Sequence, residues 1–307
     1  MSEPFFSVIT PSYQQGKFIE DTIESVLNQK DISLDEIDYI VCDAQSTDQT
    51  LDVLNKYKDR LRWTSEPDAG QADAVNKGIR MTEGDIIAWI NSDDIYYPNT
   101  FAIVQKVFLE NLDVNVVYGN ANWIDESGGF LIQYPVEKWD YKRLWKNNYI
   151  CQPSVFFRRS IIDDLGLLNT ELHYCMDYEL WLRYGEKNPF CYIQSILSGS
   201  RIYSSNKSVG SRLNAHQEVN DMLLKKIDYI PTTWIISYSL VKSEEENSLD
   251  RSEKKDLYKL IIFMIFNSLN MAIQHNLKGL PEILLKSIFW LLFPKQKANV
   301  DPWLKAI

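Results

Sequence analysis

The sequence predicts an α/β protein in which a mainly parallel sheet is flanked by helices and followed by a helical C-terminal extension. Two observations lead to this prediction. Over the first 120 residues, short apolar runs alternate with amphipathic stretches, which is the pattern of successive βαβ units. Beyond about Asn206, the chain becomes helical instead.

The expected elements follow in chain order. Five apolar runs predict strands: Phe6–Thr10, Asp38–Cys42, Leu61–Ser65, Asp85–Ile90 and Val114–Tyr118. Helical spacing of apolar residues predicts one helix in each of the four intervals: Ile19, Ile23, Val26 and Leu27; Leu51, Leu54 and Tyr57; Ala74, Val75 and Ile79; Phe101, Val104, Val107 and Phe108. In such sheets, ligands collect beyond the carboxyl ends of the strands.

Composition and charge exclude several classes of function. The chain has 307 residues, of which 45% are apolar, so it is long enough for one large domain or two modest ones. Its formal net charge of -10 argues against a general nucleic-acid binder, because duplex binding needs a surplus of Lys and Arg. Four widely spaced cysteines form no C-x-x-C pair, which indicates neither a zinc site nor a disulfide framework and fits a reducing cytosol.

No membrane-targeting or membrane-spanning segment is expected. The N-terminus lacks the basic segment and long apolar core of a secretory signal. The longest uncharged stretch, Leu260–Leu277, contains six polar residues, which makes it too polar for a spanning helix of about 20 mostly apolar residues. We therefore expect a cytoplasmic protein.

The tetrapeptide Asn91–Asp94 directly follows the apolar run Ile86–Ile90, which is typical of a buried strand. Two adjacent carboxylates are costly to crowd together unless a cation or hydrogen-bond donors compensate them. Their hard oxygen atoms suit Mg²⁺ or Mn²⁺ that bridges to substrate phosphates. The alternative is that Ser92, Asp93 and Asp94 only start a loop, as short Asp and Ser runs often do.

Polar clusters follow each of the first four strands. They begin with Thr10, Asp43, Glu66 and Asn91, and each has a structural interpretation as a turn or a helix cap. Because parallel strands end at the same edge of a sheet, the four loops are expected to share one rim. Their coincidence at one edge favours a binding site.

The segment from about Trp139 to Tyr203 is rich in aromatic residues and is expected to shape a second pocket. Within it, Tyr149–Phe157 indicates a loop leading into a strand. Helical spacing after Met176 predicts a helix that begins near Asp177. That carboxylate is either an N-cap or, paired with the upstream acidic motif, a catalytic group.

The C-terminal part holds a charged connector at Ser243–Lys255 and a final apolar segment that includes Leu284–Phe293. Lysines flank this final segment: Lys278, Lys286, Lys295, Lys297 and Lys305. Apolar helices flanked by lysines lie at anionic membrane surfaces, but the same pattern suits a helical pair packed on the domain or on another subunit. Both interpretations stay open.

Together, these motifs resemble family 2 of the inverting glycosyltransferases, the GT-A group that includes enzymes of bacterial capsule, O-antigen and polysaccharide assembly. The resemblance covers about residues 6–210 and is carried by five ordered motifs and a later acidic one: Ser7–Gln15, Ser25–Gln29, Asp43–Thr50, Glu66–Gly78, Trp89–Asp94 and Asp177–Arg183. It implies a Rossmann-like GT-A domain at 1–210, with a nucleotide-sugar half at 1–120, an acceptor half at 121–210 and a helical region at 211–307.

The resemblance also implies a role for each matching residue. Thr10, Pro11 and Tyr13 would wall the nucleotide base, and Asp43 would accept a hydrogen bond from uracil, which suggests a UDP-sugar. The other donor-side residues would be Asp68, Gln71, Asn76 and Asp93. Within the family's DXD motif, Asp94 would ligate the Mn²⁺ or Mg²⁺ that bridges the two phosphates. Asp177 matches the general base.

One departure from the family pattern concerns the metal site. Members often carry a histidine after the base motif, whereas this chain has Arg201–Ser208 there, without histidine. Tyr203 or a water would fill the coordination position, or Lys207 would compensate part of the charge of the departing diphosphate. His216 is nearby in sequence, but a lone helical histidine is more often structural.

The predicted reaction is a single displacement at the anomeric carbon with inversion, onto a hydroxyl of a glycan or lipid-linked glycan. Two rival functions stay open. A sugar-phosphate nucleotidyltransferase would need a cationic, glycine-rich loop near the N-terminus, where Thr10–Lys17 offers only Gly16 and Lys17. A non-catalytic sugar-nucleotide-binding or scaffold protein would have no need to retain Asp177.

Overall fold

The computed structural model of the protein describes residues 5–249 and 253–292. The chain forms two compact units. The first unit comprises residues 1–141 and 149–202, and the second comprises 142–148 and 203–307. The first unit contains the sheet, and the second is helical in its described part.

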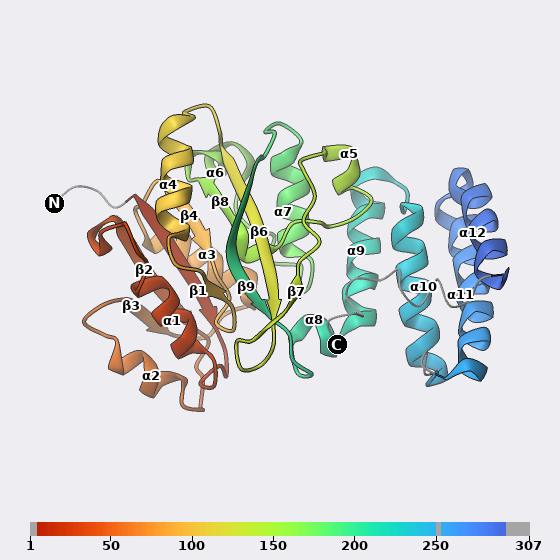
Figure 1. Ribbon diagram of the computed structural model, residues 1–307, viewed down its shortest axis with the longest axis horizontal. Coiled ribbons are helices and arrows are strands. Elements are labelled where there is room, and N and C mark those ends of the chain that lie inside the picture. The colour runs from red at the N-terminus through yellow and green to blue at the C-terminus, as the bar shows by residue number, and fades with distance from the viewer. Residues whose placement is uncertain (1–4, 250–252, 293–307) are drawn as a thin grey trace. The chain divides into compact units, whose positions relative to one another are not determined.

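The four strands at one side of the sheet are parallel and lie in the order β3-β2-β1-β4. They are β1 (Phe6–Ser12), β2 (Ile37–Asp43), β3 (Arg62–Ser65) and β4 (Ile86–Trp89). The helices between and after them are α1 (Ile19–Leu27), α2 (Thr50–Lys56), α3 (Gln71–Met81) and α4 (Thr100–Glu110). The predicted alternation of strands and helices is therefore confirmed (Figure 1).

The other side of the sheet is mixed, which the mainly parallel prediction did not include. The order continues β8-β6-β9-β5, where β4–β8, β8–β6 and β9–β5 are antiparallel and β6–β9 is parallel. These strands are β5 (Ile95–Tyr96), β6 (Val116–Ile124), β7 (Phe130–Gln133), which pairs with β6, β8 (Val155–Arg158) and β9 (Cys191–Arg201). The fifth predicted strand, β6, thus joins a second, mixed half of the sheet.

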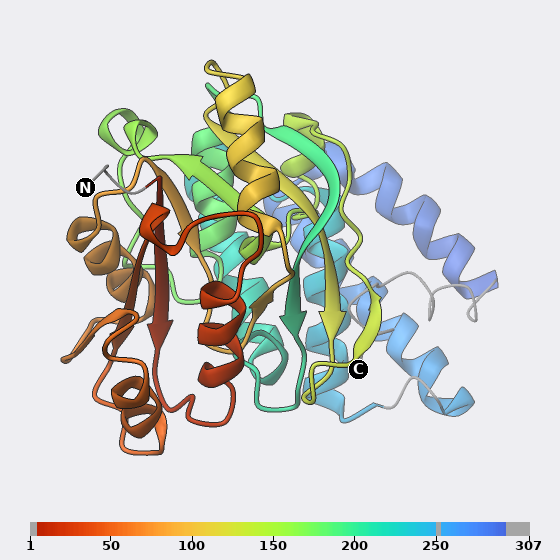
Figure 2. The ribbon, with the colours of Figure 1, turned by 60° about the vertical axis from the view of Figure 1, so that its left-hand side comes forward.

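Helices cover both faces of the sheet. Residues of α1, α2 and α4 share one apolar core with alternate residues of the strands, including Val8, Val41 and Ala88. The red α1 and the yellow α4 lie over this face in Figure 2. On the other face, α3 approaches β1 so closely that a Cβ atom at Gly78 would lie 2.5 Å from Ile9 Cγ2.

The segment between β6 and β9 bears out the two local predictions. A short 3-10 turn, η2 (Gln152–Ser154), leads into β8. The helix α7 (Met176–Gly185) begins one residue before Asp177. It packs on the sheet through Trp181, whose ring lies 6.3 Å from that of Phe157. The short helices α5 (Tyr141–Leu144) and α6 (Ser160–Leu165) complete this part of the chain.

The second unit has its own apolar core. Its helices are α8 (Lys207–Gly210), α9 (Arg212–Ile227), α10 (Thr232–Asn247), α11 (Lys254–His275), the turn η3 (Leu277–Gly279) and α12 (Leu280–Leu292). The core is built mainly from α10, α11 and α12. The predicted connector differs in its first part, because residues 243–247 continue α10; residues 250–252 and the lysines after 292 lie outside the described part.

One helix differs from the prediction that no segment is apolar enough to span a membrane. The segment Lys255–His275 is long and apolar enough to cross a membrane by length and composition, despite its polar residues. Of its most apolar stretch, 33% is buried inside the protein. Core helices of soluble proteins meet the same criteria, so this property alone assigns no location.

Candidate active site

The loops that follow the first strands meet at one edge of the sheet. The strand ends are in register: Ser12 pairs with Asp43, and Asp43 pairs with Ser65. The end of β4 lies beside β1, where Trp89 pairs with Ile9. The shared rim is thus a property of the fold, and the polar clusters of the sequence lie along it.

Asp43 is held rigidly at this rim. Its carboxylate is 2% exposed and accepts hydrogen bonds from the Ser46 backbone N–H at 3.0 Å, the Ser46 hydroxyl at 2.5 Å and the Ser65 hydroxyl at 2.7 Å. Thr10 and Pro11 are buried beside it in β1, and the Thr10 hydroxyl lies 3.1 Å from that of Tyr39. The Tyr13 side chain is the exposed member of this group.

Asn91 connects three loops of the rim. Its side-chain oxygen accepts hydrogen bonds from Gln71 at 2.7 Å and from the Trp89 indole at 3.0 Å. Its amide nitrogen donates to Gln152 at 3.1 Å and to Asp94 at 3.3 Å. The start of α3, the acidic loop (residues 91–94) and the turn before β8 are therefore joined through one side chain.

Asp94 lies inside the protein, with 3% of its surface exposed. One carboxylate oxygen accepts the Arg201 backbone N–H at 2.9 Å, and the other accepts Asn91. Burial and the adjacent negative charge of Asp93 raise the pKa of Asp94 well above its ordinary value. This carboxylate is engaged in holding its own loop.

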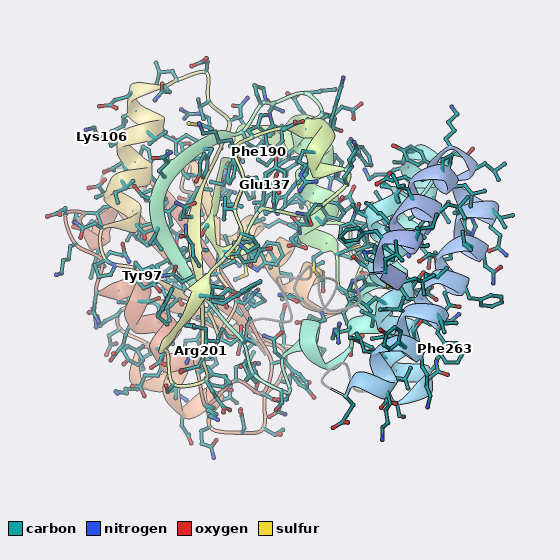
Figure 3. The ribbon with its side chains drawn as sticks, turned by 45° about the vertical axis from the view of Figure 1, so that its right-hand side comes forward. Tyr97, Lys106, Glu137, Phe190, Arg201 and Phe263 are labelled. Atoms are coloured by element: carbon teal, nitrogen blue, oxygen red, sulfur yellow. The ribbon has the colours of Figure 1, made fainter. Side chains whose placement is uncertain are left out.

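Arg201, which is labelled in Figure 3, lies at the end of β9. Its side chain holds the acidic loop in place. Its guanidinium donates to the Asp93 carbonyl at 2.8 Å, the Glu126 carbonyl at 2.7 Å and the Asp21 carboxylate at 3.0 Å. It also stacks over the Phe18 ring at 4.9 Å. Since this side chain is 1% exposed, the loop is fixed by a buried cation.

Helix α1 adds a further contact to the loop. The Thr22 hydroxyl donates to the Asp94 carbonyl at 2.7 Å. The backbone carbonyls and the Asp94 carboxylate are thus used in fixing the loop, whereas the Asp93 side chain is the partly exposed carboxylate of the pair.

The negative charges of Asp177 and of Asp94 in the acidic loop both affect the pKa of the Cys151 thiol. Burial, followed by the negative charges of Asp94 and Asp177, raises the pKa of Cys151 well above its ordinary value. Asp177 also contributes to the raised pKa of Tyr134, after burial and Cys151. Because such charge effects weaken with distance, both the predicted base and the acidic loop lie near Cys151.

The donor-side residues divide into two groups. Asp68 and Gln71 are partly exposed at the start of α3, where Asp68 accepts the Gly70 N–H at 2.8 Å. Asn76 instead is 2% exposed and bonds both backbone groups of Leu168, at 2.9 and 3.0 Å. The Asn76 amide therefore fixes the segment that leads to α7, and its role on the donor side stays a prediction.

The remaining predicted residue, Lys207, is exposed at the start of α8 and belongs to the second unit. His216 lies on α9 of that unit, with Nδ1 at 2.9 Å from the Arg212 carbonyl. Among the residues that the structure describes, no group of three or more His, Cys, Asp or Glu side chains could hold a metal ion. A cation here would need ligands from a bound diphosphate or water as well.

Sequence reasoning missed three residues of this site: Arg201, Gln152 and Cys151. Gln152 donates to the Trp89 carbonyl at 2.7 Å while it accepts from Asn91. Arg201 offered the only available signal, because it begins the segment in which a histidine was expected. No local sequence pattern indicated Cys151 or Gln152, because the residues near them in the structure lie far from them in the sequence.

Comparison with known proteins agrees with this geometry. The fold is that of the GT-A glycosyltransferases. A mannosyltransferase from Pyrobaculum calidifontis in complex with GDP-Man and Mn²⁺ aligns with a TM-score of 0.61 and 16% identity over 100% of this chain and 85% of its own. S. aureus TarS with UDP-GlcNAc aligns with a TM-score of 0.58 and 16% identity over 96% and 91%.

The chain belongs to glycosyl transferase family 2, whose sequence model matches residues 7–166, more than half of the chain. An uncharacterized glycosyltransferase of Rickettsia prowazekii is 28% identical over 243 residues, which are 73% of this chain and 73% of that protein. The chondroitin synthase of Escherichia coli is 26% identical over 245 residues, which are 75% of this chain but 35% of the synthase. The match likewise spans 37% of an uncharacterized Rickettsia felis glycosyltransferase.

Proposed function

We propose that the protein transfers a sugar, with inversion, from a nucleotide-diphosphate donor to a hydroxyl of a glycan or lipid-linked glycan. One observation carries this proposal: Asp177 and Asp94 both lie near the buried Cys151 thiol, whose pKa is raised by burial first and then by these two charges. Two carboxylate groups near one point suit a displacement, in which one group serves the incoming hydroxyl and the other the departing diphosphate.

The donor side is assigned to the rim of the parallel strands. Tyr13 offers an exposed ring for the base, beside the buried Thr10 and Pro11. Asp43 accepts the uracil N–H in this proposal, which favours a UDP-sugar, and its bonds to Ser46 and Ser65 keep its carboxylate oriented. Asp68 and Gln71 lie on the sugar side, and Lys207 is the candidate cation for the diphosphate.

A divalent ion, Mn²⁺ or Mg²⁺, fits the residues of the acidic loop. Its preferred ligands are oxygen atoms, and Mg²⁺ commonly uses one or two carboxylates together with substrate phosphates. Asp94 is 3% exposed whereas Asp93 is partly exposed, so Asp93 is the more accessible of the two for direct contact. When bound, the ion would neutralise charge on the leaving diphosphate.

Asp177 is the proposed general base. The acceptor hydroxyl forms its bond to the anomeric carbon as the bond from that carbon to the diphosphate oxygen breaks. The hydroxyl proton passes to the Asp177 carboxylate, and the diphosphate leaves with the electron pair. Asp177 is partly exposed at the first turn of α7, as a base that meets a dissolved or membrane-bound acceptor must be.

The decisive variant is Asp177→Asn. A neutral amide cannot accept the proton, so kcat should fall by about 10³-fold or more while the Kd for UDP changes less than about threefold. Calorimetric titration with UDP and a sugar-transfer assay measure the two quantities. Glu171→Gln, which neutralises an exposed carboxylate in the loop before α7, is the matched control and should keep its activity. Near-normal transfer by Asp177→Asn would exclude this base.

Two measurements separate the rival functions. A nucleotidyltransferase would release pyrophosphate from a nucleoside triphosphate in the presence of a sugar phosphate. A scaffold protein would bind the donor without hydrolysing it, whereas the proposed enzyme should hydrolyse its donor slowly with Mn²⁺ and without acceptor. The same assay tests whether the native activity requires the ion.

The sugar can be identified by thermal stabilisation. A ligand that binds only the folded state raises the unfolding temperature according to its concentration over Kd, so the correct donor should produce the largest shift in a screen of UDP- and GDP-sugars. We place this activity in the cytoplasm, at the inner face of the plasma membrane, where nucleotide sugars and lipid-linked acceptors meet.

A further inference from the structure

The helices α11 and α12 of the second unit expose an apolar surface. The side chains with large exposure form what we call the outer face: Tyr258, Ile262, Phe263, Phe266 and Ile273 of α11, and Leu284, Leu285, Ile288, Phe289, Leu291 and Leu292 of α12. The two helices pack against each other (Figure 1), and Phe263 is labelled in Figure 3. Large exposed apolar patches mark interaction sites.

Four of the five exposed residues of α11 lie along one line of the helix. Tyr258, Ile262, Phe266 and Ile273 are spaced by four, four and seven residues, so they project from the same side. Leu260, Ile261 and Met264 face the unit's core and are almost fully buried. The helix is therefore apolar toward the core and also apolar toward solvent.

The shorter helix α12 repeats this arrangement. Its buried side contributes Ile283 and Trp290 to the core, while Leu285, Ile288 and Leu292 are 70%, 57% and 68% exposed. Their spacing of three and four residues again places them on one side. Packing in the core of the unit therefore does not explain why these three side chains are apolar.

The charge of the same segment indicates what covers the outer face. Residues 254–292 contain five lysines, Lys254, Lys255, Lys259, Lys278 and Lys286, but only two acids, Asp256 and Glu282. The chain as a whole has a net charge of -10. The most apolar exposed surface is thus carried by a locally basic segment of an acidic protein.

We propose that the outer face binds the surface of an anionic lipid bilayer. Apolar side chains enter the boundary of the acyl chains, and lysines contact the negative headgroups. A two-fold dimer through the same face would bring equivalent lysine-bearing segments together, which disfavours a second copy as the occupant. The inference goes beyond sugar transfer, because it concerns where the protein lies rather than what it catalyses.

The test uses the full chain and vesicles of phosphatidylcholine, with and without phosphatidylglycerol. The triple variant Phe266→Ser/Leu285→Ser/Ile288→Ser removes apolar surface from the outer face. The matched control is Leu109→Ser/Leu112→Ser/Phe130→Ser, which removes comparably exposed residues from the first unit. Cosedimentation measures partitioning, circular dichroism checks folding, and light scattering gives the molecular mass.

The native protein and the control should bind the anionic vesicles and bind the neutral ones more weakly. The outer-face variant should partition about tenfold less or worse, while it keeps its helicity and UDP affinity. Native protein that stays in solution with anionic vesicles, or equal losses in both triple variants, would overturn the proposal. A native dimer that the outer-face variant converts to monomer, without vesicle binding, would assign the face to a second copy. Because no step requires sugar transfer, an inactive enzyme would leave this test intact.

Discussion

In the first unit, Asp43, Asp94 and Arg201 are almost completely buried, whereas in the second unit Phe266 and Leu285 are mostly exposed to solvent. The first unit gives its buried polar groups partners, so that they fix loops at the rim of the sheet. The second unit leaves apolar side chains outside a core that is complete without them. This difference matches our two proposals, which assign the chemistry to the first unit and the attachment to the second.

The sharpest test of this contrast is Arg201→Met. The change removes a buried guanidinium and leaves the Asp93 and Glu126 carbonyls without this donor, so the free energy of unfolding should fall by about 3 kcal/mol. Arg62→Met is the control, because that arginine is exposed and its pair with Asp38 should contribute under about 1 kcal/mol. Urea denaturation measures the free energy of unfolding of both variants. Equal losses would show that Arg201 stabilises the protein no more than an exposed arginine does.

Substitution of the two aspartates of the acidic loop should have different effects. Asp93→Asn should weaken Mn²⁺-dependent UDP binding by about 100-fold, because its carboxylate is the partly exposed one. Asp94→Asn should affect the loop and the stability more than the ion. Titration of UDP with and without Mn²⁺ measures the effect, and an unchanged Mn²⁺ requirement in Asp93→Asn would return the ion to Asp94.

The buried carboxylate also predicts a pH dependence. Since the pKa of Asp94 is raised in the folded state, its contribution to stability is present at low pH and is lost as pH rises through that pKa. The stability of the native protein relative to Asp94→Asn should therefore fall as pH rises from about 4. Unfolding temperatures over this range provide the measurement, and a difference that does not vary with pH would contradict the sign.

Asp48 provides the matched control for that experiment. Burial acts to raise its pKa, but hydrogen bonds from Thr50 and Gly16 lower the pKa overall. Its contribution to stability is therefore present above the unfolded pKa and is lost as pH falls. Relative to Asp48→Asn, the native protein should gain stability as pH rises, which is the opposite slope.

The smallest effect is expected on the outer face. Leu285→Ser should change the free energy of unfolding by less than about 0.5 kcal/mol, because the side chain is mostly exposed. Ile283→Ala, two residues earlier and fully buried, should cost about 2–5 kcal/mol. Thermal or urea unfolding distinguishes them, and a large cost at Leu285 would mean that the outer face belongs to the core.

Local pattern was sufficient for strands β1, β2, β3, β4 and β6, for the first four helices and for the helix at Asp177. Periodic apolar residues decide such elements, because each must bury one face. The mixed half of the sheet was not predictable in this way. Strands β8 and β9 take their neighbours from distant segments, and the two-residue β5 is too short for a periodic signal.

The sequence by itself determined the class of protein, because the ordered motifs at strand ends are local patterns of residue type. It also selected the acidic pair and Asp177 as candidates. Only the tertiary structure decided which of these groups are fixed in place: Arg201 and Asn91 join segments that are far apart in the chain. A hydrogen bond depends on distance and direction in space, and neither can be obtained from the order of residues alone.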